Sequence, residues 1–360
     1  MKKLALITLA ALVLLPMIAQ DKRFNMYGVM FYNLENLFDT INNNGVYDLE
    51  FSPNGARQWN NEKYWKKQHN MAYTIGQIVT QGTPDGPAII GVCEIENITV
   101  LQDLVRQPEI KNRRYQIVHH DSPDRRGVDV GLLYNPRVFK VLNVTNQRLT
   151  KRYYDALGYS DRFNPDSRTR DQLCVTGLLA GEKVSVLVNH WPSRLGGQEQ
   201  SSYLREAAAQ MARETIDSLL LDDPNQGILF MGDLNDDPQD TSMAKVLRGR
   251  RDWKDVTAVG DIYNPWWKLL DKGIGTLAYR GGWNLFDQIV MSDYFLRDYE
   301  GKDKNRLTFF RAEVLNREFL KTNEGDRQGY PMRTYSAGVF LNGYSDHFPT
   351  IIYLIKEVKQ

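Results

Sequence analysis

The chain has 360 residues, of which 42% are hydrophobic, so it is long and apolar enough to form a sizeable packed core. Its 45 basic side chains balance 44 acidic ones, and a net charge of +1 indicates no overall attraction to nucleic acid or to anionic lipid. Local basic runs such as residues 248–251 are interpreted as solvated surface.

The N-terminal segment has the layout of a secretory signal peptide. Lys2 and Lys3 precede an apolar run at residues 4–19. A retained N-terminal anchor is the alternative interpretation. We expect residues 1–20 to be a signal peptide and residues 21–360 to form one domain, exported to the periplasm or out of the cell.

Cys93 and Cys174 are the two cysteines of the chain. Export would permit a disulfide between them. Both lie in apolar runs, so they are equally consistent with two buried small hydrophobic side chains. Two cysteines are too few for a disulfide scaffold or a zinc site.

Short apolar segments rich in Val, Ile, Leu and aromatic residues predict strands at residues 27–34, 88–95, 128–135, 183–191, 227–234, 286–292 and 348–355. Most of them are too apolar to be covered on one face only. Apolar residues at helical spacing predict helices at 61–81 and 201–221. Strands and a few long helices without strict alternation favour an α/β sandwich of mixed or antiparallel sheets. We expect long surface loops at 40–60, 150–167 and 300–340.

Polar side chains cluster at or beside the ends of most predicted strands. They are Asn33, Glu35, Glu94, Glu96, Asn189, His190, Asp233, Asn235, Asp287, Asp346 and His347. Any one cluster commonly forms only a turn. Several carboxylates at buried strand ends, however, need a cation or hydrogen bonds. If they meet at one rim, they form an oxygen-rich site for Mg²⁺, or for Mn²⁺ or Ca²⁺, rather than for zinc.

The acidic stretch at residues 232–238 partly matches two known metal motifs. Asp233, Asn235 and Asp237 fit the first three ligand positions of a calcium-binding EF-hand loop. Pro238 and Ala244 stand where that loop requires Gly and Glu, so this interpretation fails. Calcineurin-like metallophosphatases combine a Gly-Asp block with an Asn-His block. In those enzymes the aspartate block comes first, whereas here the Asn-His block does.

The ordered set of strand-end blocks resembles the endonuclease/exonuclease/phosphatase family. The blocks lie at residues 31–39, 91–97, 126–134, 188–194, 231–238, 286–290 and 345–349. Each block is weak alone, but their order is specific and spans nearly the whole mature chain. The family includes DNase I-like nucleases, AP endonucleases, neutral sphingomyelinases and inositol polyphosphate phosphatases. The resemblance implies a four-layer α/β sandwich with the active site at one end, and Mg²⁺-dependent hydrolysis of phosphoesters.

Position by position, the resemblance also implies roles for the metal and the water. Glu94 is the expected principal Mg²⁺ ligand. Asn33 is expected to support the metal and the substrate phosphate. Asp346 is expected to ligate or orient a second metal. Asp233 would orient or deprotonate the attacking water, and Asn235 would hydrogen-bond the scissile phosphate.

Two histidines complete the implied catalytic set. His347 resembles the catalytic histidine, with Asp287 fixing its tautomer and supporting its positive charge. His190 resembles the histidine that contacts phosphate or assists the leaving group. Such side chains suit phosphodiester cleavage, which needs an in-line water, neutralised phosphate oxygens and help for the departing oxygen. How the two histidines divide these tasks stays open.

Other positions bear on the choice of ligand and substrate. Glu96 competes with Glu94 as the metal ligand, since strand alternation places both on one face. Arg168 and Arg170 are candidate phosphate contacts, as are Arg125, Arg126 and Arg194, with ordinary surface charge as the alternative. The aromatic stretch at 263–270 is interpreted as core packing in preference to a surface that stacks a base.

The favoured function is an exported Mg²⁺-dependent phosphodiesterase acting on nucleic acid. A phosphatase or a sphingomyelinase-like phospholipase C, acting on a small phosphoester or a lipid headgroup, is the alternative. AP endonucleases usually carry a different block at residues 188–194, so the histidine form favours the other branches of the family. A non-catalytic binding protein would be expected to lack some of the catalytic side chains, and all are present. No stable protein partner is implied.

Overall fold

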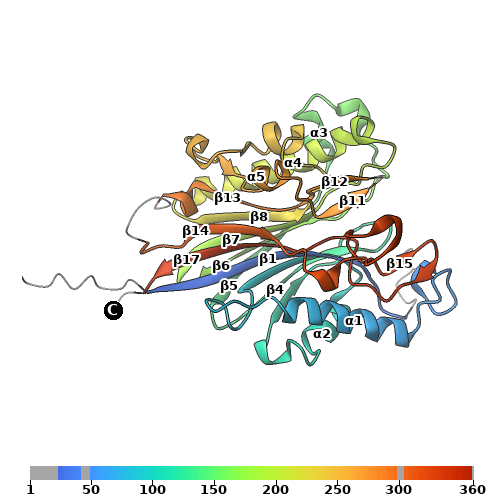
Figure 1. The fold of residues 1–360 in the computed structure, drawn as a ribbon. Helices are drawn as coiled ribbons and strands as arrows, with labels where there is room; N and C mark the ends of the chain where they lie inside the picture. Colours follow the sequence, from blue (N-terminus) through green and yellow to red (C-terminus); the bar gives the residue numbers. More distant parts are fainter. Residues whose placement is uncertain (1–22, 42–48, 280, 298–303, 359–360) are drawn as a thin grey trace, which may run out of the picture.

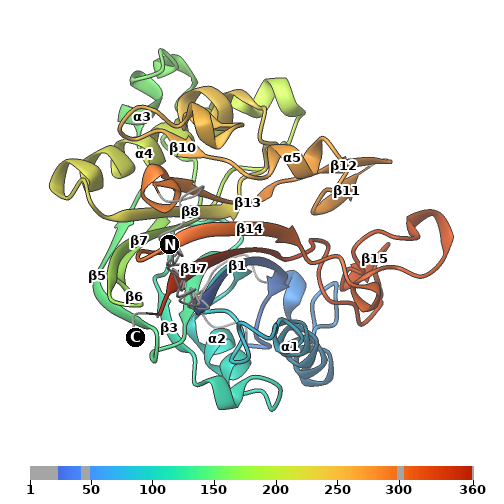
Figure 2. The same cartoon turned by 60° about the vertical axis from the view of Figure 1, so that its left-hand side comes forward.

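The computed structural model describes residues 23–41, 49–279, 281–297 and 304–358. Two β-sheets pack face to face, with helices on both outer faces (Figures 1 and 2). The helices α1 (Asn61–Gly76) and α2 (Ile98–Val105) cover one sheet. The helices α3 (Lys151–Asp155), α4 (Gln198–Asp222) and α5 (Trp267–Leu270) lie over the other. The predicted four-layer sandwich is confirmed.

The first sheet has six strands, in the order β14 (Thr308–Val314), β17 (Thr350–Glu357), β1 (Phe24–Leu37), β2 (Ile89–Ile95), β4 (Asp129–Tyr134) and β3 (Gln116–His119). The second has seven, in the order β5 (Phe139–Gln147), β6 (Gln172–Leu179), β7 (Glu182–His190), β8 (Gly227–Asp233), β13 (Asp287–Ser292), β10 (Ile262–Tyr263) and β9 (Gly249–Arg250). Two hairpins, β11 (Leu277–Tyr279) with β12 (Gly282–Asn284) and β15 (Tyr335–Ser336) with β16 (Val339–Phe340), lie outside these sheets.

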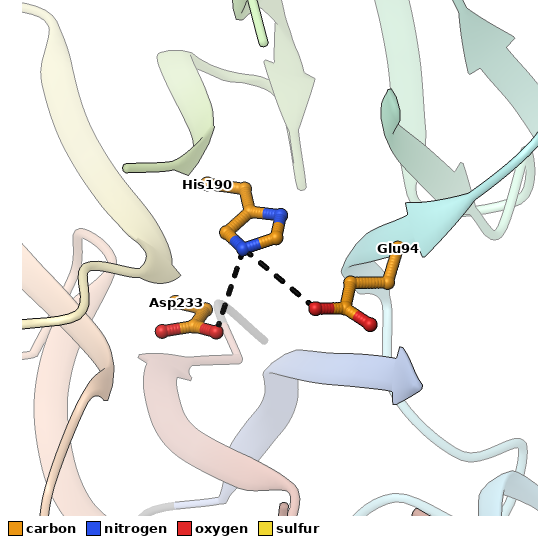
Figure 3. Close-up of side chains that lie close together, drawn as sticks. All are labelled: Glu94, His190 and Asp233. Carbon is orange, nitrogen blue, oxygen red and sulfur yellow. Dashed lines mark ion pairs between the residues drawn. The ribbon is translucent and has the colours of Figure 1, made fainter. Parts of the chain in front are cut away.

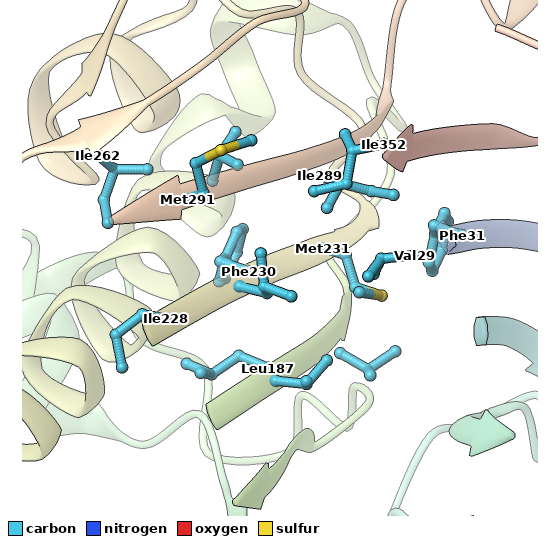
Figure 4. Close-up of a cluster of buried hydrophobic side chains, with 14 of the residues drawn as sticks. Val29, Phe31, Leu187, Ile228, Phe230, Met231, Ile262, Ile289, Met291 and Ile352 are labelled. Carbon is cyan, nitrogen blue, oxygen red and sulfur yellow. The ribbon is translucent and has the colours of Figure 1, made fainter. Parts of the chain in front are cut away.

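The central strands are apolar on both faces because each face is buried. In β1, Val29 and Phe31 point into the core between the sheets, whereas Met30 and Tyr32 pack in the layer of α1 and α2. Figure 4 shows the inter-sheet core, where β1 approaches Met231 of β8. The sheets are close here, since a Cβ on Gly91 would lie 2.4 Å from the Met231 sulfur.

Each sheet contains a parallel pair joined through an α-helix, and the short strands β9 and β10 form a further parallel pair in the second sheet. The helix α1 connects β1 to β2, and α4 connects β7 to β8. The carboxyl ends of two parallel strands meet at one edge of a sheet, where sites are commonly built. This topology brings polar strand ends from both sheets to the same end of the sandwich.

The sequence-based prediction missed strands at the sheet edges and also β6 and β10, which lie inside the second sheet. The expected loop at 300–340 contains β14, and the loop at 150–167 contains α3. Tyr153 and Tyr154 of α3 are buried in a small cluster with α4. Edge strands and short helices have too few apolar positions for a clear period. The aromatic stretch at 263–270 does serve the core, since Tyr263 and Trp266 are buried.

Three further expectations concern export. Residues 1–20, the expected signal peptide, lie outside the described residues. Cys93 and Cys174 are buried and unpaired, so they act as small apolar side chains. Among the described helices, none combines the length and apolarity needed to cross a membrane.

Candidate active site

Strand register brings three of the expected catalytic side chains side by side in the second sheet. Asp233 ends β8 and is paired with His190 on the parallel strand β7. On its other side Asp233 is paired with Asp287, the first residue of the antiparallel strand β13. His190, Asp233 and Asp287 are 5%, 3% and 0% exposed, so they form a row of buried polar groups at one end of the sheet.

The first sheet contributes Glu94 through a β-bulge. Cys93 and Ile95 pair with consecutive residues of β4, which leaves Glu94 as the extra residue. Its φ of 58° lies in the left-handed region, which is uncommon for a residue other than Gly. The bulge breaks the alternation that would place Glu94 and Glu96 together. Glu96 instead accepts a hydrogen bond from the Asp39 amide at 2.7 Å.

Glu94 faces the row of polar groups across the end of the sandwich (Figure 3). Its Oε1 lies 3.8 Å from His190 Nε2, and His190 Nε2 lies 3.7 Å from Asp233 Oδ2. The other oxygen, Oε2, accepts a hydrogen bond from the Asn36 amide at 3.0 Å. One donor atom from each of Glu94, His190 and Asp233 lies within 4.8 Å of the others. Two facing carboxylates at this spacing fit a divalent cation that prefers oxygen ligands.

Asn33 and Asn235 hold Asp233 in place from either side. The Asn33 side-chain amide donates to Asp233 Oδ2 at 3.0 Å. The Asn235 backbone amide donates to Oδ1 at 3.1 Å, and its side-chain amide donates to the Trp191 carbonyl at 3.0 Å. Burial raises the pKa of Asp233 to about 7, against the lowering effect of His347. Asp233 therefore exchanges a proton near neutral pH when no cation is bound.

His347 and Asp287 form a buried ion pair. The distance from His347 Nδ1 to Asp287 Oδ2 is 2.6 Å, and the His347 Nε2 lies 3.9 Å from Asp233 Oδ2. Burial alone would lower the pKa of His347, but Asp287 and Asp233 together raise it well above its ordinary value. His347 is therefore a cation at neutral pH, with Nε2 directed toward Asp233.

His190 has the opposite electrostatic environment. Burial, with the positive charges of Arg170 and Arg126, lowers the pKa of His190 well below its ordinary value. Its Nδ1 finds no hydrogen-bond partner among the described residues. The site thus combines one neutral and one cationic imidazole on the two sides of Asp233.

Asp346, the expected second metal ligand, is already engaged by an arginine. Arg333 Nη2 lies 2.5 Å from Asp346 Oδ2, and Arg333 Nε lies 3.9 Å from Glu35 Oε1. Burial would raise the pKa of Asp346, but His347 and Arg333 hold it below its usual range. Glu35 also lies 3.6 Å from the buried Lys67 ammonium.

The two expected phosphate-binding arginines have different surroundings. Arg168 is exposed on the surface. The side chain of Arg170 is 8% exposed, and it donates to Asp124 and to the carbonyls of His190 and Trp191, at 2.6–3.1 Å. Its guanidinium therefore fixes the end of β7.

The structure also places three cations beside the site, namely Arg126, which was a candidate phosphate contact, and Arg333 and Lys67, which the sequence patterns did not identify. Arg126 Nη2 lies 3.7 Å from Glu94 Oε1, and its side chain is 46% exposed. Arg333 is 36% exposed beside Asp346. Both come from loops, and only the packing of those loops shows which arginines face the site. Lys67 lies on α1, where helical periodicity alone does not reveal a buried ammonium.

The last two acids of the stretch at 232–238 shape the turn and do not face the site. Asp236 lies 2.6 Å from Arg205 Nε of α4 and accepts a hydrogen bond from Ser242 at 2.6 Å. Asp237 accepts the Leu285 amide at 2.7 Å, which ties the turn to the segment before β13. The four polar side chains of this stretch are thus two pairs with different tasks.

A further His/Asp group lies near the start of β4. His119, Asp121 and Asp129 could place one ligand atom each within 4.8 Å of the others. Asp129 is already bonded on both oxygens, because Oδ2 lies 3.0 Å from His119 Nε2 and Oδ1 accepts two hydrogen bonds from Ser122. This arrangement anchors the loop that leads to Arg126.

Comparison with known proteins agrees with this fold. No curated protein matches the chain in sequence. Similar solved structures include an endonuclease/exonuclease/phosphatase family protein from Bacteroides thetaiotaomicron, with 14% identity and a TM-score of 0.54 over 94% of this chain and 100% of that one. A mannosyl-6-phosphatase from the same species has 15% identity and a TM-score of 0.51 over 91% and 99%. TDP2 from D. rerio, complexed with a single-strand DNA product, has 14% identity and a TM-score of 0.50 over 91% and 98%.

The family assignment comes from the sequence match. A model of the Endonuclease/Exonuclease/phosphatase family matches residues 28–356, which is most of the chain. The solved neighbours support the DNase I-like arrangement of two mixed sheets with flanking helices. The chain therefore belongs to the endonuclease/exonuclease/phosphatase family of phosphoester-hydrolysing enzymes.

Proposed function

We propose that the protein is an exported phosphodiesterase that uses Mg²⁺ to hydrolyse nucleic acid. One observation carries the proposal. Asp233 Oδ2 lies 3.7 Å from the neutral His190 and 3.9 Å from the cationic His347, while Glu94 faces them from the other sheet. The cluster contains Asp233 as a base, the cationic imidazole of His347 and the two carboxylates of Glu94 and Asp233. These groups suit in-line attack of water on a phosphate.

The chemistry divides among the residues as follows. Glu94, with Asn33 and Asp233 beside it, would hold the cation. When bound, Mg²⁺ supplies charge neutralisation for the phosphate oxygens. Asp233 accepts a proton from the attacking water. Hydrogen bonds from the Asn33 side chain and the Asn235 amide fix the Asp233 carboxylate, so that it orients this water.

The two histidines and Asn235 then act on the phosphate. His347, held by Asp287, stabilises negative charge and can donate the Nε2 proton to the departing oxygen. His190 is neutral and can donate or accept a hydrogen bond at a phosphate oxygen. Asn235 has a partly exposed side chain at the same edge, suited to a second phosphate contact.

A cavity beside the catalytic cluster supports a substrate larger than phosphate. Its volume is about 540 Å³, and its lining includes Asp346, Arg333, Arg327, Tyr279 and Tyr330. Aromatic rings beside guanidinium groups suit a nucleoside next to a phosphate, since bases stack on aromatic side chains. The neighbour that holds a single-strand DNA product shares the fold and is consistent with this choice.

A phosphatase acting on a small phosphoester is the second candidate. The net charge of +1 favours it, because binding of long nucleic acid usually relies on an excess of basic residues. The neighbour named as a mannosyl-6-phosphatase shows that this fold accommodates a sugar phosphate. A lipid headgroup belongs to the same class of small phosphoesters.

Hydrolysis assays with matched variants test the proposal. Protein lacking residues 1–20 is incubated with single-stranded and duplex DNA, RNA, mannose 6-phosphate and sphingomyelin vesicles, with Mg²⁺ or with EDTA. We expect metal-dependent cleavage of nucleic acid that His347→Ala abolishes. The exposed histidine variant His69→Ala is the control and keeps full activity. Hydrolysis of the sugar phosphate or the lipid alone would exclude the nuclease assignment, and no hydrolysis with any substrate would exclude the enzyme itself.

A further inference from the structure

Two fixed cations sit next to the carboxylates that flank the proposed metal position. Arg333 contacts Asp346 at 2.5 Å and lies 3.9 Å from Glu35. Lys67 lies 3.6 Å from the other oxygen of Glu35. Glu35 and Asp346 are therefore each paired with a positive side chain of the chain itself.

The Lys67 ammonium is built into the protein. Lys67 is 1% exposed, and its Nζ donates to Thr334 Oγ1 and to the Tyr344 carbonyl, both at 2.6 Å. An ammonium is buried at this depth only when it is paired and hydrogen-bonded. Glu35 Oε2 in turn accepts the Thr334 amide and hydroxyl, both at 2.7 Å. The contacts leave neither group free to rotate away.

The ion pairs fix how much negative charge remains for a metal. Glu35 and Asp346 are balanced by Lys67 and Arg333, and Asp287 is balanced by His347. Transfer of a proton between Lys67 and Glu35 would leave the net charge of that pair unchanged. The carboxylates of Glu94 and Asp233 then remain, and their two charges match one divalent cation. The half-exposed Arg126, 3.7 Å from Glu94, only lowers the remaining charge further.

We propose that this site binds a single divalent cation, at Glu94 and Asp233, and that Lys67 with Arg333 occupies the place of a second cation at Glu35 and Asp346. The inference deepens the proposed function and rests on its metal dependence. It replaces the expectation that Asp346 ligates a second metal. Lys67 and Arg333 act on the site through Glu35 and Asp346, so they are positioning residues.

Counting bound Mn²⁺ tests the proposal without reference to activity. Free Mn²⁺ is measured by electron paramagnetic resonance while Mn²⁺ is added to the protein without residues 1–20. We expect one Mn²⁺ in the unmodified protein, one in Asp346→Asn and none in Glu94→Gln. Two Mn²⁺ in the unmodified protein, or loss of one in Asp346→Asn, would overturn the proposal.

Two gain-of-site variants test the role of the cations. Lys67→Met and Arg333→Met each free a carboxylate, so the count should rise from one to two. Lys66→Met, whose ammonium is exposed and paired with Glu62, is the matched control and keeps one. Arg333 is half-exposed, so its variant remains informative if Lys67→Met does not fold. One Mn²⁺ in every folded variant would refute the assignment to Lys67 and Arg333.

The outcome separates this inference from the proposed function. Metal-dependent cleavage of nucleic acid together with a count of two Mn²⁺ would overturn only the inference. Absence of both Mn²⁺ binding and metal-dependent hydrolysis would overturn the two proposals together.

Discussion

Replacing Asp287 by Asn removes the charge that holds His347 as a cation while it keeps the size of the side chain. Asp287 is fully buried and lies 2.6 Å from His347 Nδ1. Asn can still form a hydrogen bond there, so the fold of the strand end should persist. The variant therefore isolates the electrostatic contribution of the pair.

The size of the effect follows from the geometry of the pair. Two unit charges centred about 4 Å apart, at an effective dielectric constant of about 20, attract each other by about 4 kcal/mol. Losing that attraction lowers the pKa of His347 in the variant, because the Asp287 charge is the largest of the effects that raise it. Because burial also disfavours the cation, the imidazole of the variant should be neutral at pH 7. Loss of a positioned acid typically lowers a rate by about 10²- to 10⁴-fold.

A pH profile of kcat/KM provides the measurement. In the unmodified protein His347 stays protonated through neutral pH, so its titration limits activity on the alkaline side, whereas protonation of Asp233 limits activity on the acid side. In Asp287→Asn the alkaline fall should occur at a lower pH, because the imidazole loses its proton more readily without the Asp287 charge. Asp293→Asn, at a surface acid paired with Arg297, is the control and should leave the profile unchanged. The reasoning would be refuted if kcat/KM of Asp287→Asn fell at the same alkaline pH as kcat/KM of the unmodified protein.

Three further expectations concern stability and metal binding. Arg205→Met should lower the free energy of unfolding by about 1–3 kcal/mol in urea titrations, because the buried Asp236 carboxylate loses its 2.6 Å partner and keeps Arg194, at 3.3 Å, as its remaining cation; an unchanged free energy of unfolding would show that the pair with Arg205 is dispensable. Gly232→Ala should cost about 3 kcal/mol or more, since its Cβ would lie 2.4 Å from the Asn189 carbonyl oxygen, and an unchanged melting temperature would contradict the close approach. Metal binding should release close to one proton at about pH 6 and almost none at about pH 8.5, because the pKa of Asp233 is raised to about 7 and the cation binds the carboxylate form. Calorimetry in buffers of different ionisation enthalpy measures that release, and equal release at both pH values would count against Asp233 as the group that titrates.

The sequence is most informative where a residue stands at the end of a buried strand. His190, Asp233 and Asp287 follow or begin strongly apolar segments, and the strand register aligns them as expected. His347 reaches the same edge because β17 pairs antiparallel with β1, as the strand-end position of residues 345–347 suggested.

Other parts of the site depend on local backbone geometry or on loops. Simple alternation did not separate Glu94 from Glu96, because a bulge with a left-handed residue redirects Glu94. Arg126 and Arg333 reach the site from loops whose course depends on tertiary contacts. The pairing of Lys67 with Glu35 joins residues more than thirty positions apart, and a pattern within one helix cannot show it.

A crystal structure with a short single-stranded oligonucleotide and Mn²⁺, obtained with Asp287→Asn to slow turnover, tests the central claim most directly. We expect one anomalous Mn²⁺ peak between Glu94 and Asp233. We also expect a phosphate of the oligonucleotide in contact with His190 and Asn235, on the side that His347 faces. A phosphate bound elsewhere on the molecule, or a Mn²⁺ peak at Glu35 and Asp346 in place of Glu94, would contradict the account.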